Sequence, residues 1–307
     1  MSQSQKAIGI DLGGTHIKAV LIDEKGSILK KVHIPTDDHK KEAPWKAAIK
    51  TCFLELAIDM ASQSPIVGLS APGIPNGDFS AIACMPGRLE GLENFQWAEY
   101  LRLGQVPVVN DAVAALIAEY HFGAGKGYKN LVLITLGTGV GGALLIDGKI
   151  HLGFMQKAGH FGHLTLSAPS FALDSFQIPD SLEDAIGNHN IFQRSFGRYT
   201  TTKDLVKGYE AHEPIASYVW LTSVQKLAAA LASIGNMVSP ECILIGGGIA
   251  QADSSLFTPL KEFMDIYEWR PGKEKMNIQK VAYDDFAGAI GAAQNARINI
   301  QSKNFLY

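Results

Sequence analysis

The sequence predicts an α/β protein of about two domains. Its 307 residues, 47% of them apolar, are enough for two ordinary globular domains of roughly 150 residues each. A stretch of fourteen residues occurs twice: residues 134–147, ITLGTGVGGALLID, align without a gap on residues 10–23, IDLGGTHIKAVLID, with seven identities. Strand patterns come first in pairs and then alternate with helical patterns, which is typical of the α/β class.

Each copy of the repeated segment is an apolar run, a turn rich in glycine and threonine, and a second apolar run, which predicts a β-hairpin. Turns of this composition expose backbone N–H groups and hydroxyls, which suit a phosphate chain. Such a turn can also be no more than a tight turn. Because the two copies match without a gap, we favour a phosphate ligand that is held between two lobes.

The balance of charges excludes several classes of partner. The chain has 27 basic and 30 acidic residues with no basic stripe, so we expect no nucleic-acid partner. No apolar run reaches the roughly 18 residues of a membrane span, so we expect no membrane partner. The first residues lack the pattern of a signal peptide, which predicts a cytoplasmic protein. Cys52, Cys84 and Cys242 lie in apolar contexts and are expected to be buried, reduced thiols.

The elements of the first half follow from apolar spacing and turn residues. Helical spacing of Ala48, Cys52, Leu56 and Met60 predicts the first helix. The second helix starts after a buried strand that ends in a polar pair, which is how an α/β sheet presents residues at its carboxyl edge. The expected elements are a hairpin at 6–23, strands at 26–34, 66–69 and 106–109, helices at 42–62 and 112–120, and a loop at 70–77 with Pro-Gly and Asn-Gly turn pairs.

The second half alternates helices and strands after the second hairpin. Residues 149–181 are irregular and hold His151, His160 and His163, so we expect ligand-binding loops there. A strand at 242–245 runs directly into three glycines. The other expected elements are helices at 183–196 and 215–237, a strand at 278–283, and a helix of small residues at 286–296 that can pack closely on a neighbour.

Six short motifs, in their order and spacing, resemble the ROK family. They are DLGGT at 11–15, PG at 72–73, ND at 110–111, LGTGVGG at 136–142, GHFGH at 159–163 and IGGGI at 245–249. That family contains bacterial glucokinases and related sugar kinases. The resemblance covers nearly the whole chain and implies a two-lobed actin-like ATPase (ribonuclease H-like) fold, in which each lobe is a mixed sheet with flanking helices and the nucleotide and sugar bind in the interlobe cleft.

The resemblance also implies the division of the chain and the reaction. We expect an N-terminal lobe at 1–112, joined by the helix of 286–307, and a C-terminal lobe at 113–285. The implied activity transfers the terminal phosphoryl group of ATP, with Mg²⁺, to a hexose, usually at the 6-hydroxyl. Polyphosphate stays open as an alternative donor. A homodimer and closure of the lobes over the sugar are expected as well.

Asp111 follows a buried strand and precedes a helix. The resemblance implies that it is the general base, which accepts the proton of the sugar hydroxyl as the oxygen attacks. Its position alone allows an N-cap just as well, since aspartate is favoured there and Asn110-Asp111 would serve. One side chain could do both at different times.

Asp11 is assigned to Mg²⁺ through water, because a carboxylate beside phosphates is tolerable only with a cation between them. The alternative is a turn-forming residue. Lys18 matches a position that is often basic in glucokinase-like members, although a solvated strand lysine explains it as well. The other expected nucleotide contacts are backbone or hydroxyl groups in glycine-rich turns: Gly13, Gly14, Thr15, Thr138 and Gly139 for phosphate, and Gly246, Gly247 and Gly248 on the adenosine side.

The resemblance carries sugar-binding roles to Asn110, Asp111, His163 and Glu183, the last through SLEDA at 181–185. Polar groups from separate loops are what a polyol requires, since each buried hydroxyl needs a partner. The family has a glutamate where this chain has His160. An imidazole at this sugar-binding position changes the hydroxyls that can be satisfied.

A second departure concerns zinc. Many members follow the histidine of GHFGH with CxCGxxGC, whose cysteines bind structural zinc, yet residues 167–184 contain no cysteine. Zinc of that type needs four soft ligands, and Asp174 and His189 fit no zinc spacing. We predict no structural zinc and a loop that folds around its apolar side chains, Phe171, Leu173, Phe176 and Ile178.

Three classes of function follow from the resemblance. An ATP-dependent hexokinase is favoured because the nucleotide motifs and Asp111 are intact. A sugar-sensing repressor would carry a helix-turn-helix ahead of DLGGT, and only about six residues precede the first strand, which leaves no room for one. The third class is a sugar-binding protein with weak or lost kinase activity, which His160 and the missing cysteines motivate.

Overall fold

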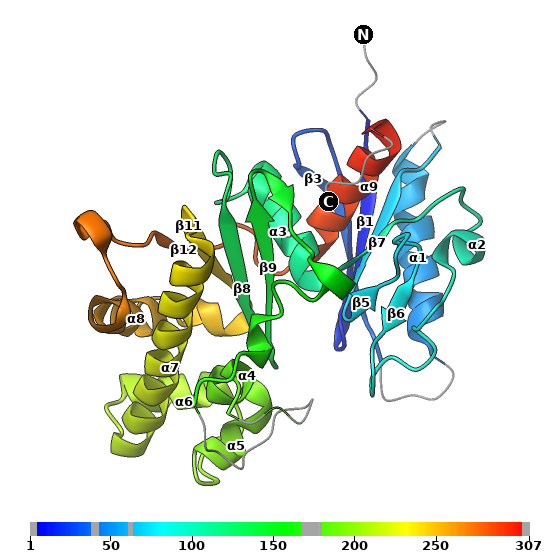
Figure 1. Cartoon of the computed structure of the whole chain (residues 1–307). Helices are drawn as coiled ribbons and strands as arrows, with labels where there is room; N and C mark the ends of the chain where they lie inside the picture. The colour runs from blue at the N-terminus through cyan, green and yellow to red at the C-terminus, as the bar shows by residue number, and fades with distance from the viewer. Residues whose placement is uncertain (1–4, 38–42, 61–63, 168–177, 179, 303–307) are drawn as a thin grey trace. The chain divides into compact units, whose positions relative to one another are not determined.

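The computed structural model describes residues 5–37, 43–60, 64–167, 178 and 180–302 (Figure 1). Contacts between Cα atoms divide the chain into two compact units. Unit 1 comprises Met1–Tyr128, Leu144–Ala158 and Val281–Tyr307, and unit 2 comprises Lys129–Ala143 and Gly159–Lys280. The lobe boundaries at 112 and 285 stay a prediction.

Unit 1 is built on a five-stranded sheet. Its strands are β1 (Ala7–Leu12), β2 (His16–Ile22), β3 (Ile28–Pro35), β4 (Val67–Ala71) and β7 (Val108–Asn110). Their order is β3-β2-β1-β4-β7. The predicted first hairpin is confirmed: β1 and β2 pair antiparallel, with Asp11 opposite Lys18. Because β1, β4 and β7 are parallel, their carboxyl ends meet at one edge of the sheet.

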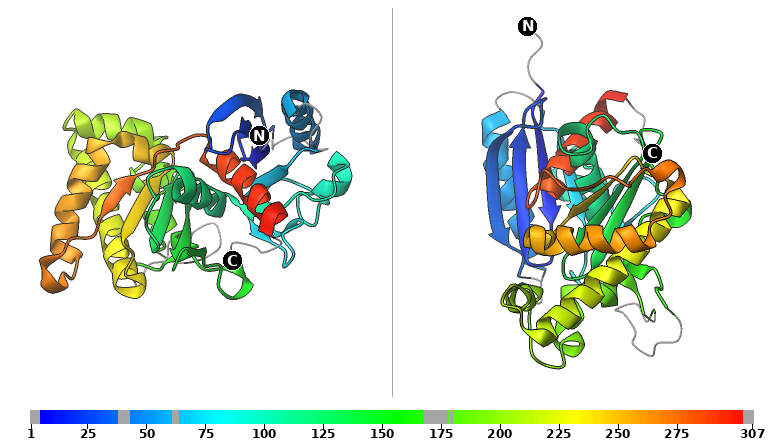
Figure 2. Two further views of the ribbon diagram at one scale, coloured as in Figure 1. Left: turned by 90° about the horizontal axis from the view of Figure 1, so that it is seen from above. Right: turned by 90° about the vertical axis from the view of Figure 1, so that its left-hand side faces the viewer.

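Helices cover both faces of this sheet. Helix α1 (Trp45–Ala57) packs on the face of Ile8 and Ile10, as its predicted apolar spacing requires. Helices α3 (Asp111–Phe122) and α9 (Ala287–Ser302) lie side by side on the face of Ala7 (Figure 2). Residues 42, 61 and 62 of the predicted first helix lie outside the described residues.

Helix α9 lies directly on the backbone of the sheet. A Cβ atom at Gly9 would lie 1.8 Å from the carbonyl oxygen of Ala289, and one at Gly68 would lie 2.0 Å from that of Ala292. Gly9 and Gly68 are register partners on neighbouring strands. The small residues of α9 and these two glycines therefore form one close contact, as the sequence of the helix predicted.

Glu119 fixes the segment through which the chain re-enters unit 1. Its side chain is 0% exposed, and its carboxylate accepts hydrogen bonds from the N–H groups of Ala124 (2.8 Å), Ala282 (3.0 Å) and Tyr283 (2.7 Å). Because these N–H groups are taken, the strand predicted at 278–283 ends early, as β12 (Ile278–Lys280).

Two expectations for unit 1 are wrong. The segment 70–77 is not all loop, because β4 reaches Ala71 and β5 (Ile74–Pro75) pairs with β6 (Ile82–Cys84). Cys84 lies on this small two-stranded sheet and is exposed, whereas Cys52 and Cys242 are buried as expected, and all three are free thiols. Helix α2 (Trp97–Leu101), which the sequence did not predict, follows.

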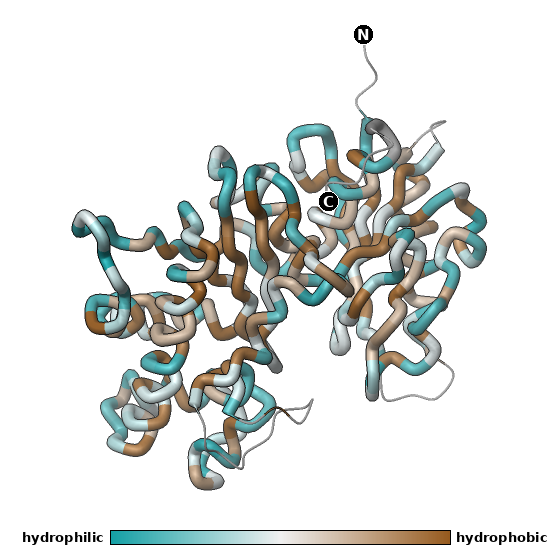
Figure 3. Tube along the Cα trace, in the orientation of Figure 1, coloured by the Kyte–Doolittle hydropathy of each residue, from teal (hydrophilic) through white to brown (hydrophobic). Residues whose placement is uncertain are grey.

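A second five-stranded sheet repeats the plan of the first. Its strands are β8 (Leu131–Leu136), β9 (Val140–Ile146), β10 (Lys149–Ile150), β11 (Cys242–Gly246) and β12, in the order β10-β9-β8-β11-β12. The second copy of the repeated segment forms β8 and β9, which hold the places of β1 and β2, and β11 is parallel to β8 as β4 is to β1. Apolar residues follow the strands of both sheets (Figure 3).

Within its described residues, unit 2 contains the α-helices α4 (Leu182–Ile186), α5 (Ile191–Arg194), α6 (Thr202–Glu210), α7 (Pro214–Val238) and α8 (Ser254–Tyr267). Helix α7 confirms the prediction at 215–237. The single helix predicted at 183–196 is wrong, since Gly187, with ψ 154°, interrupts it between α4 and α5. Helices α6 and α8 were not predicted.

No helix within the described ranges is long and apolar enough to cross a bilayer. Residues 149–167 are irregular apart from β10 and two short 3-10 turns, as predicted. Three residues of the expected apolar loop, Phe171, Leu173 and Phe176, and the weighed zinc ligand Asp174 lie outside the described residues.

Candidate active site

The first turn rich in glycine and threonine connects β1 to β2, and hydrogen bonds hold its backbone in place. The N–H of Gly13 donates to the carbonyl oxygen of His16 at 3.1 Å. The buried Thr36 donates its hydroxyl to the carbonyl oxygen of Gly13 at 2.6 Å and its N–H to that of Thr15 at 2.9 Å. Thr15 is exposed on this fixed turn, where a phosphate could reach it, and Gly14 is partly exposed.

Asp11 lies beside that turn in unit 1. The hydroxyl of Ser70 donates to its Oδ1 at 2.7 Å, and a Cβ atom at Gly288 would lie 2.6 Å from its Cγ. The carboxylate therefore packs against the first turn of α9, where the helix dipole favours an anion. Burial nevertheless raises the pKa of Asp11 from 3.8 to about 6, the Ser70 hydrogen bond opposes this, and the charge of Asp111 adds to it.

Lys18 is the cross-strand neighbour of Asp11 and supplies a countercharge. Its Nζ lies 3.1 Å from Oδ1 of Asp285, and its charge lowers the pKa of Asp11. The structure thus gives Lys18 two carboxylate neighbours in unit 1. A phosphate contact by Lys18 stays a prediction.

The structure shows which residue of the Asn110-Asp111 pair caps helix α3. Asn110 is the N-cap of α3: its Oδ1 accepts from the N–H groups of Ala112 (2.9 Å) and Val113 (3.3 Å), and its Nδ2 donates to the carbonyl oxygen of Gly73 (3.0 Å). Asp111 is the first residue of the helix, and its Oδ1 accepts from the Ala112 N–H at 2.8 Å. Asn110 fills the capping position, so capping does not account for the carboxylate of Asp111.

Asp111 is exposed at the carboxyl edge of the sheet, yet protein atoms surround it closely enough to displace much of its water. This desolvation raises the pKa of Asp111, while hydrogen bonds from the start of α3 and the charge of Arg88 lower it. A carboxylate made more basic and left accessible is suited to accept a proton.

The second turn, in unit 2, is held by a different segment. The N–H of Gly137 donates to the carbonyl oxygen of Gly139 at 2.9 Å, and the N–H groups of Asn188 and His189 donate to those of Gly137 and Thr138, each at 3.0 Å. The interruption of the predicted helix at Gly187 is what brings this segment to the turn. Thr138 stays exposed at the tip.

Glu183 lies beneath the same turn and is 8% exposed. Its Oε2 accepts from the N–H of Val140 at 3.1 Å, and a Cβ atom at Gly139 would lie 2.1 Å from that oxygen. The glycine at 139 is therefore required for this contact. The observed place of Glu183 is that of an anchor for the turn, and the sugar contact predicted for it stays a prediction.

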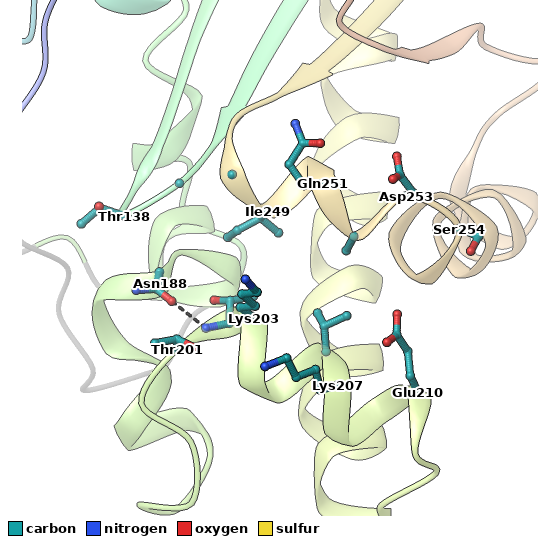
Figure 4. Close-up of a pocket in the computed structure, with 15 residues that line it drawn as sticks. Thr138, Asn188, Thr201, Lys203, Lys207, Glu210, Ile249, Gln251, Asp253 and Ser254 are labelled. Atoms are coloured by element: carbon teal, nitrogen blue, oxygen red, sulfur yellow. Dashed lines mark hydrogen bonds between the residues drawn. The ribbon is translucent and has the colours of Figure 1, made fainter. Parts of the chain in front are cut away.

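Unit 2 contains a pocket of about 820 Å³, the size of a small-molecule site (Figure 4). The second turn forms one end, helix α6 supplies one wall, and the 3-10 helix Gly248–Ala252 with Asp253 and Ser254 supplies the other. Figure 4 shows Thr138 at the end opposite Glu210 and Ser254. The polar side chains of the walls include Thr201, Thr202, Lys203, Lys207, Glu210, Gln251, Asp253 and Ser254.

The three glycines after β11 have separate structural reasons. Gly246 ends the buried strand, and Gly247, with φ +86°, would place a Cβ atom 2.4 Å from the carbonyl oxygen of Leu136. Gly248 lines the pocket, and a Cβ atom there would meet no atom within 4 Å. Of the predicted adenosine-side glycines, Gly248 therefore lies in the pocket wall and leaves space in front of it.

The ROK family model matches residues 7–298. The chain belongs to the ROK family. Glucokinase from Streptomyces coelicolor is 28% identical over 328 residues, which cover 94% of this chain and 97% of that protein. N-acetylmannosamine kinase from Salmonella paratyphi B is 27% identical and matches 93% of this chain and 96% of its own length.

A solved ROK glucokinase from Streptomyces griseus, in complex with glucose and AMPPNP, has a TM-score of 0.79 and 23% identity, over 95% of this chain and 99% of that one. This likeness confirms the predicted two-lobed actin-like ATPase fold. The ROK resemblance of the six motifs is confirmed by the family match.

His160 and His163 mark the departure of this ROK chain from the family pattern. Their rings are stacked, with centroids 6.3 Å apart and planes at 7°, and both side chains are partly exposed. In unit 2, the structure thus places His160, which replaces the family's glutamate, beside His163, the histidine that is expected to bind sugar. Two imidazoles offer directional donors and acceptors for hydroxyls, but no fixed negative charge.

The predicted site residues of this ROK protein form two groups. Unit 1 brings together the first turn, Asp11, Lys18 and the Asn110-Asp111 pair, and unit 2 brings together the second turn, Glu183 and the wall glycine Gly248. Asp11 with Ser70 suits a cation that keeps its water shell, since Mg²⁺ accepts one protein carboxylate with phosphate oxygens completing the shell. Among the described residues, no group of three or more His, Cys, Asp or Glu could hold a metal ion.

The sequence did not predict several of the residues that contact these two groups. Thr36 and Arg88 reach the first turn from distant segments, and no local pattern marks them. Helix α6, which forms one wall of the pocket, could have been predicted from its capping-box sequence. Thr201 is its N-cap and accepts from the N–H of Asp204 at 3.1 Å.

Proposed function

We propose that this ROK protein transfers the terminal phosphoryl group of ATP to a hydroxyl of a hexose, with Asp111 as the general base. That it is a sugar kinase follows from relatives of that class over nearly its whole length. The hexose, its 6-hydroxyl and the role of Asp111 are the proposal. The homodimer and the cytoplasmic location stay predictions.

The observation that carries the proposal is the accessible carboxylate of Asp111 behind a cap that Asn110 supplies. In the proposed step, Asp111 accepts the proton of the sugar hydroxyl while that oxygen forms a bond to the γ-phosphorus. The bond between the γ-phosphorus and the bridging oxygen breaks, and ADP leaves with the electron pair. Phosphoryl transfer needs positioning and charge neutralisation more than covalent chemistry, which suits the two fixed turns.

We infer that ATP places its adenosine in the pocket of unit 2 and its phosphates toward Thr138 and Gly139. Gly248 supports this, because its open space lets a nucleotide approach the backbone. Asp11 would hold Mg²⁺ through water, and the bound ion would neutralise phosphate charge. The N–H groups and hydroxyl of the first turn, in unit 1, are suited to bind phosphate as well.

The test is an assay of ADP release with Mg-ATP against hexoses, amino sugars and N-acetyl sugars. We expect at least one sugar to turn over, and Asp111→Asn to lower kcat by roughly 100-fold or more. The matched control is Asp78→Asn, which alters an exposed aspartate of unit 1 whose Oδ1 accepts from the Ser80 hydroxyl. Turnover of Asp111→Asn at the rate of the control would refute the base assignment.

The departure at His160 supports one alternative, a ROK protein that binds sugar without phosphorylating it. This alternative predicts sugar binding by calorimetry but no sugar-dependent ADP release with any acceptor. His160→Glu, which restores the family residue, would then be the variant in which turnover is sought.

A further inference from the structure

The guanidinium of Arg88 lies on the first phosphate turn. A Cβ atom at Gly14 would lie 1.4 Å from Nη2 of Arg88 and 2.6 Å from its Cζ. The charged group thus occupies the space that a side chain at position 14 would fill. Gly14 is therefore needed for this contact as well as for the shape of the turn.

The backbone that presents Arg88 is fixed by the core of unit 1. Leu89 and Leu92 are each 1% exposed, and the N–H of Leu92 donates to the carbonyl oxygen of Leu89 at 3.0 Å. On the other side, the N–H of Met85 donates to Oε1 of Glu93 at 2.7 Å. Arg88 itself is exposed, but Leu89 after it is buried and Met85 before it is held by a hydrogen bond, which restricts the directions that its side chain can take.

The charges around Arg88 point the same way. Its cation faces the carboxylate of Asp111 and lowers the pKa of that group, whereas Lys18 is the cation that faces Asp11. Asp11 and Asp111 also face each other. Asp11 and Asp111 thus each have a basic neighbour, and Arg88 is the one of the two that also contacts the first turn.

We propose that Arg88 binds the phosphoryl group in transit, between the Gly13–Thr15 turn and the general base. This inference rests on the proposed function. A guanidinium is planar and offers paired donors that match phosphate oxygens, which a lysine does not. As the sugar oxygen bonds to phosphorus and the bridging oxygen departs with ADP, charge spreads over the equatorial oxygens, and Arg88 donates to them.

The kinetic test compares Arg88→Gln with Arg102→Gln, which alters another exposed arginine of unit 1. We expect Arg88→Gln to lower kcat by roughly 100-fold or more, with the KM values for ATP and sugar changed less than about threefold. We expect Arg102→Gln to match the wild type. In Arg88→Ala, added guanidinium should restore part of kcat. A kcat within about threefold of the wild type, or a loss confined to KM for the sugar, overturns the proposal.

A binding measurement separates this proposal from the proposed function. Orthophosphate binding in the presence of Mg²⁺, followed by ³¹P NMR line width, needs neither nucleotide nor turnover. We expect binding to the wild type and at least about tenfold weaker binding to Arg88→Gln. If no sugar turns over, the proposed function fails by itself. Equal phosphate binding by the two proteins, or none by the wild type, overturns the role of Arg88.

Discussion

Nε2 of His189 lies 3.0 Å from Oδ1 of Asp184, and its Nδ1 lies 3.2 Å from the carbonyl oxygen of Thr138. Both ring nitrogens of His189 therefore lie within hydrogen-bond distance of an oxygen. Asp184 also accepts from Nδ2 of Asn190 at 3.1 Å. The side chain of His189 therefore links the second turn to a carboxylate, in addition to the bond from the backbone N–H of His189 to Thr138.

We predict that His189→Ala raises KM for ATP by about tenfold, because losing a hydrogen bond of about 1 to 2 kcal/mol lets the turn move. The KM for sugar should change little. Steady-state kinetics with each substrate varied in turn checks this. The control is His212→Ala, at an exposed histidine of unit 2. An unchanged KM for ATP in His189→Ala would show that the backbone bonds hold the turn without the ring.

The pKa of Asp11 predicts a pH-dependent cost in stability. Its pKa is raised from 3.8 to about 6, so the folded protein holds more protons than the unfolded chain between these values. The free energy of unfolding falls as pH rises through this window and stays lowered above pH 6. Asp11→Asn should therefore raise the free energy of unfolding by about 2 kcal/mol at pH 7.5 without Mg²⁺ and nucleotide, and much less at pH 4.5.

Urea unfolding at the two pH values measures this difference, and the same variant should lose Mg-dependent activity. Asp78→Asn is a control of opposite sign, because hydrogen bonds from the hydroxyl and N–H of Ser80 lower the pKa of Asp78. Equal effects of Asp11→Asn at both pH values would contradict the assignment of the pKa.

Gly248 gives a prediction for the pocket. A methyl group added there meets no protein atom within 4 Å, so Gly248→Ala should leave the melting temperature unchanged or slightly raised. The same methyl group enters the proposed nucleotide space and should weaken ATP binding by about tenfold, as overpacking does. Calorimetric titration of ATP and a thermal melt give both values.

Gly104→Ala is the matched control, since a Cβ atom there also meets no atom within 4 Å and Gly104 lies in unit 1, outside the pocket. We expect ATP to bind this variant as it binds the wild type. If Gly248→Ala also bound ATP normally, the adenosine would have to lie elsewhere.

The sequence predicted the parts of the fold whose signals are local. The two copies of the repeated segment gave both hairpins, because apolar alternation and glycine turns act over neighbouring residues. The strand that ends at Asn110 and the close packing of α9 also came from local patterns. These parts include most of the predicted phosphate contacts.

Features set by distant contacts were missed or wrong. Apolar spacing alone predicted one helix over 183–196. The helix ends at Gly187 because the N–H groups of residues 188 and 189 bond to the second turn instead. Cys84 is exposed because its strand belongs to a two-stranded sheet, which apolar context does not show. Thr36 and Arg88 act on a turn more than 20 residues away, and no periodicity records such pairs.

The contact of α9 with Gly9 and Gly68 affects the order in which the chain can fold during synthesis. One face of the first sheet is completed by a helix that follows all of unit 2 in the sequence, so a nascent chain lacks this part of the cover of that face while unit 2 is synthesised. Proteolysis or a premature stop that removed α9 would expose β1 and β4 together. The two glycines that admit the helix so closely leave no side chains to fill its place.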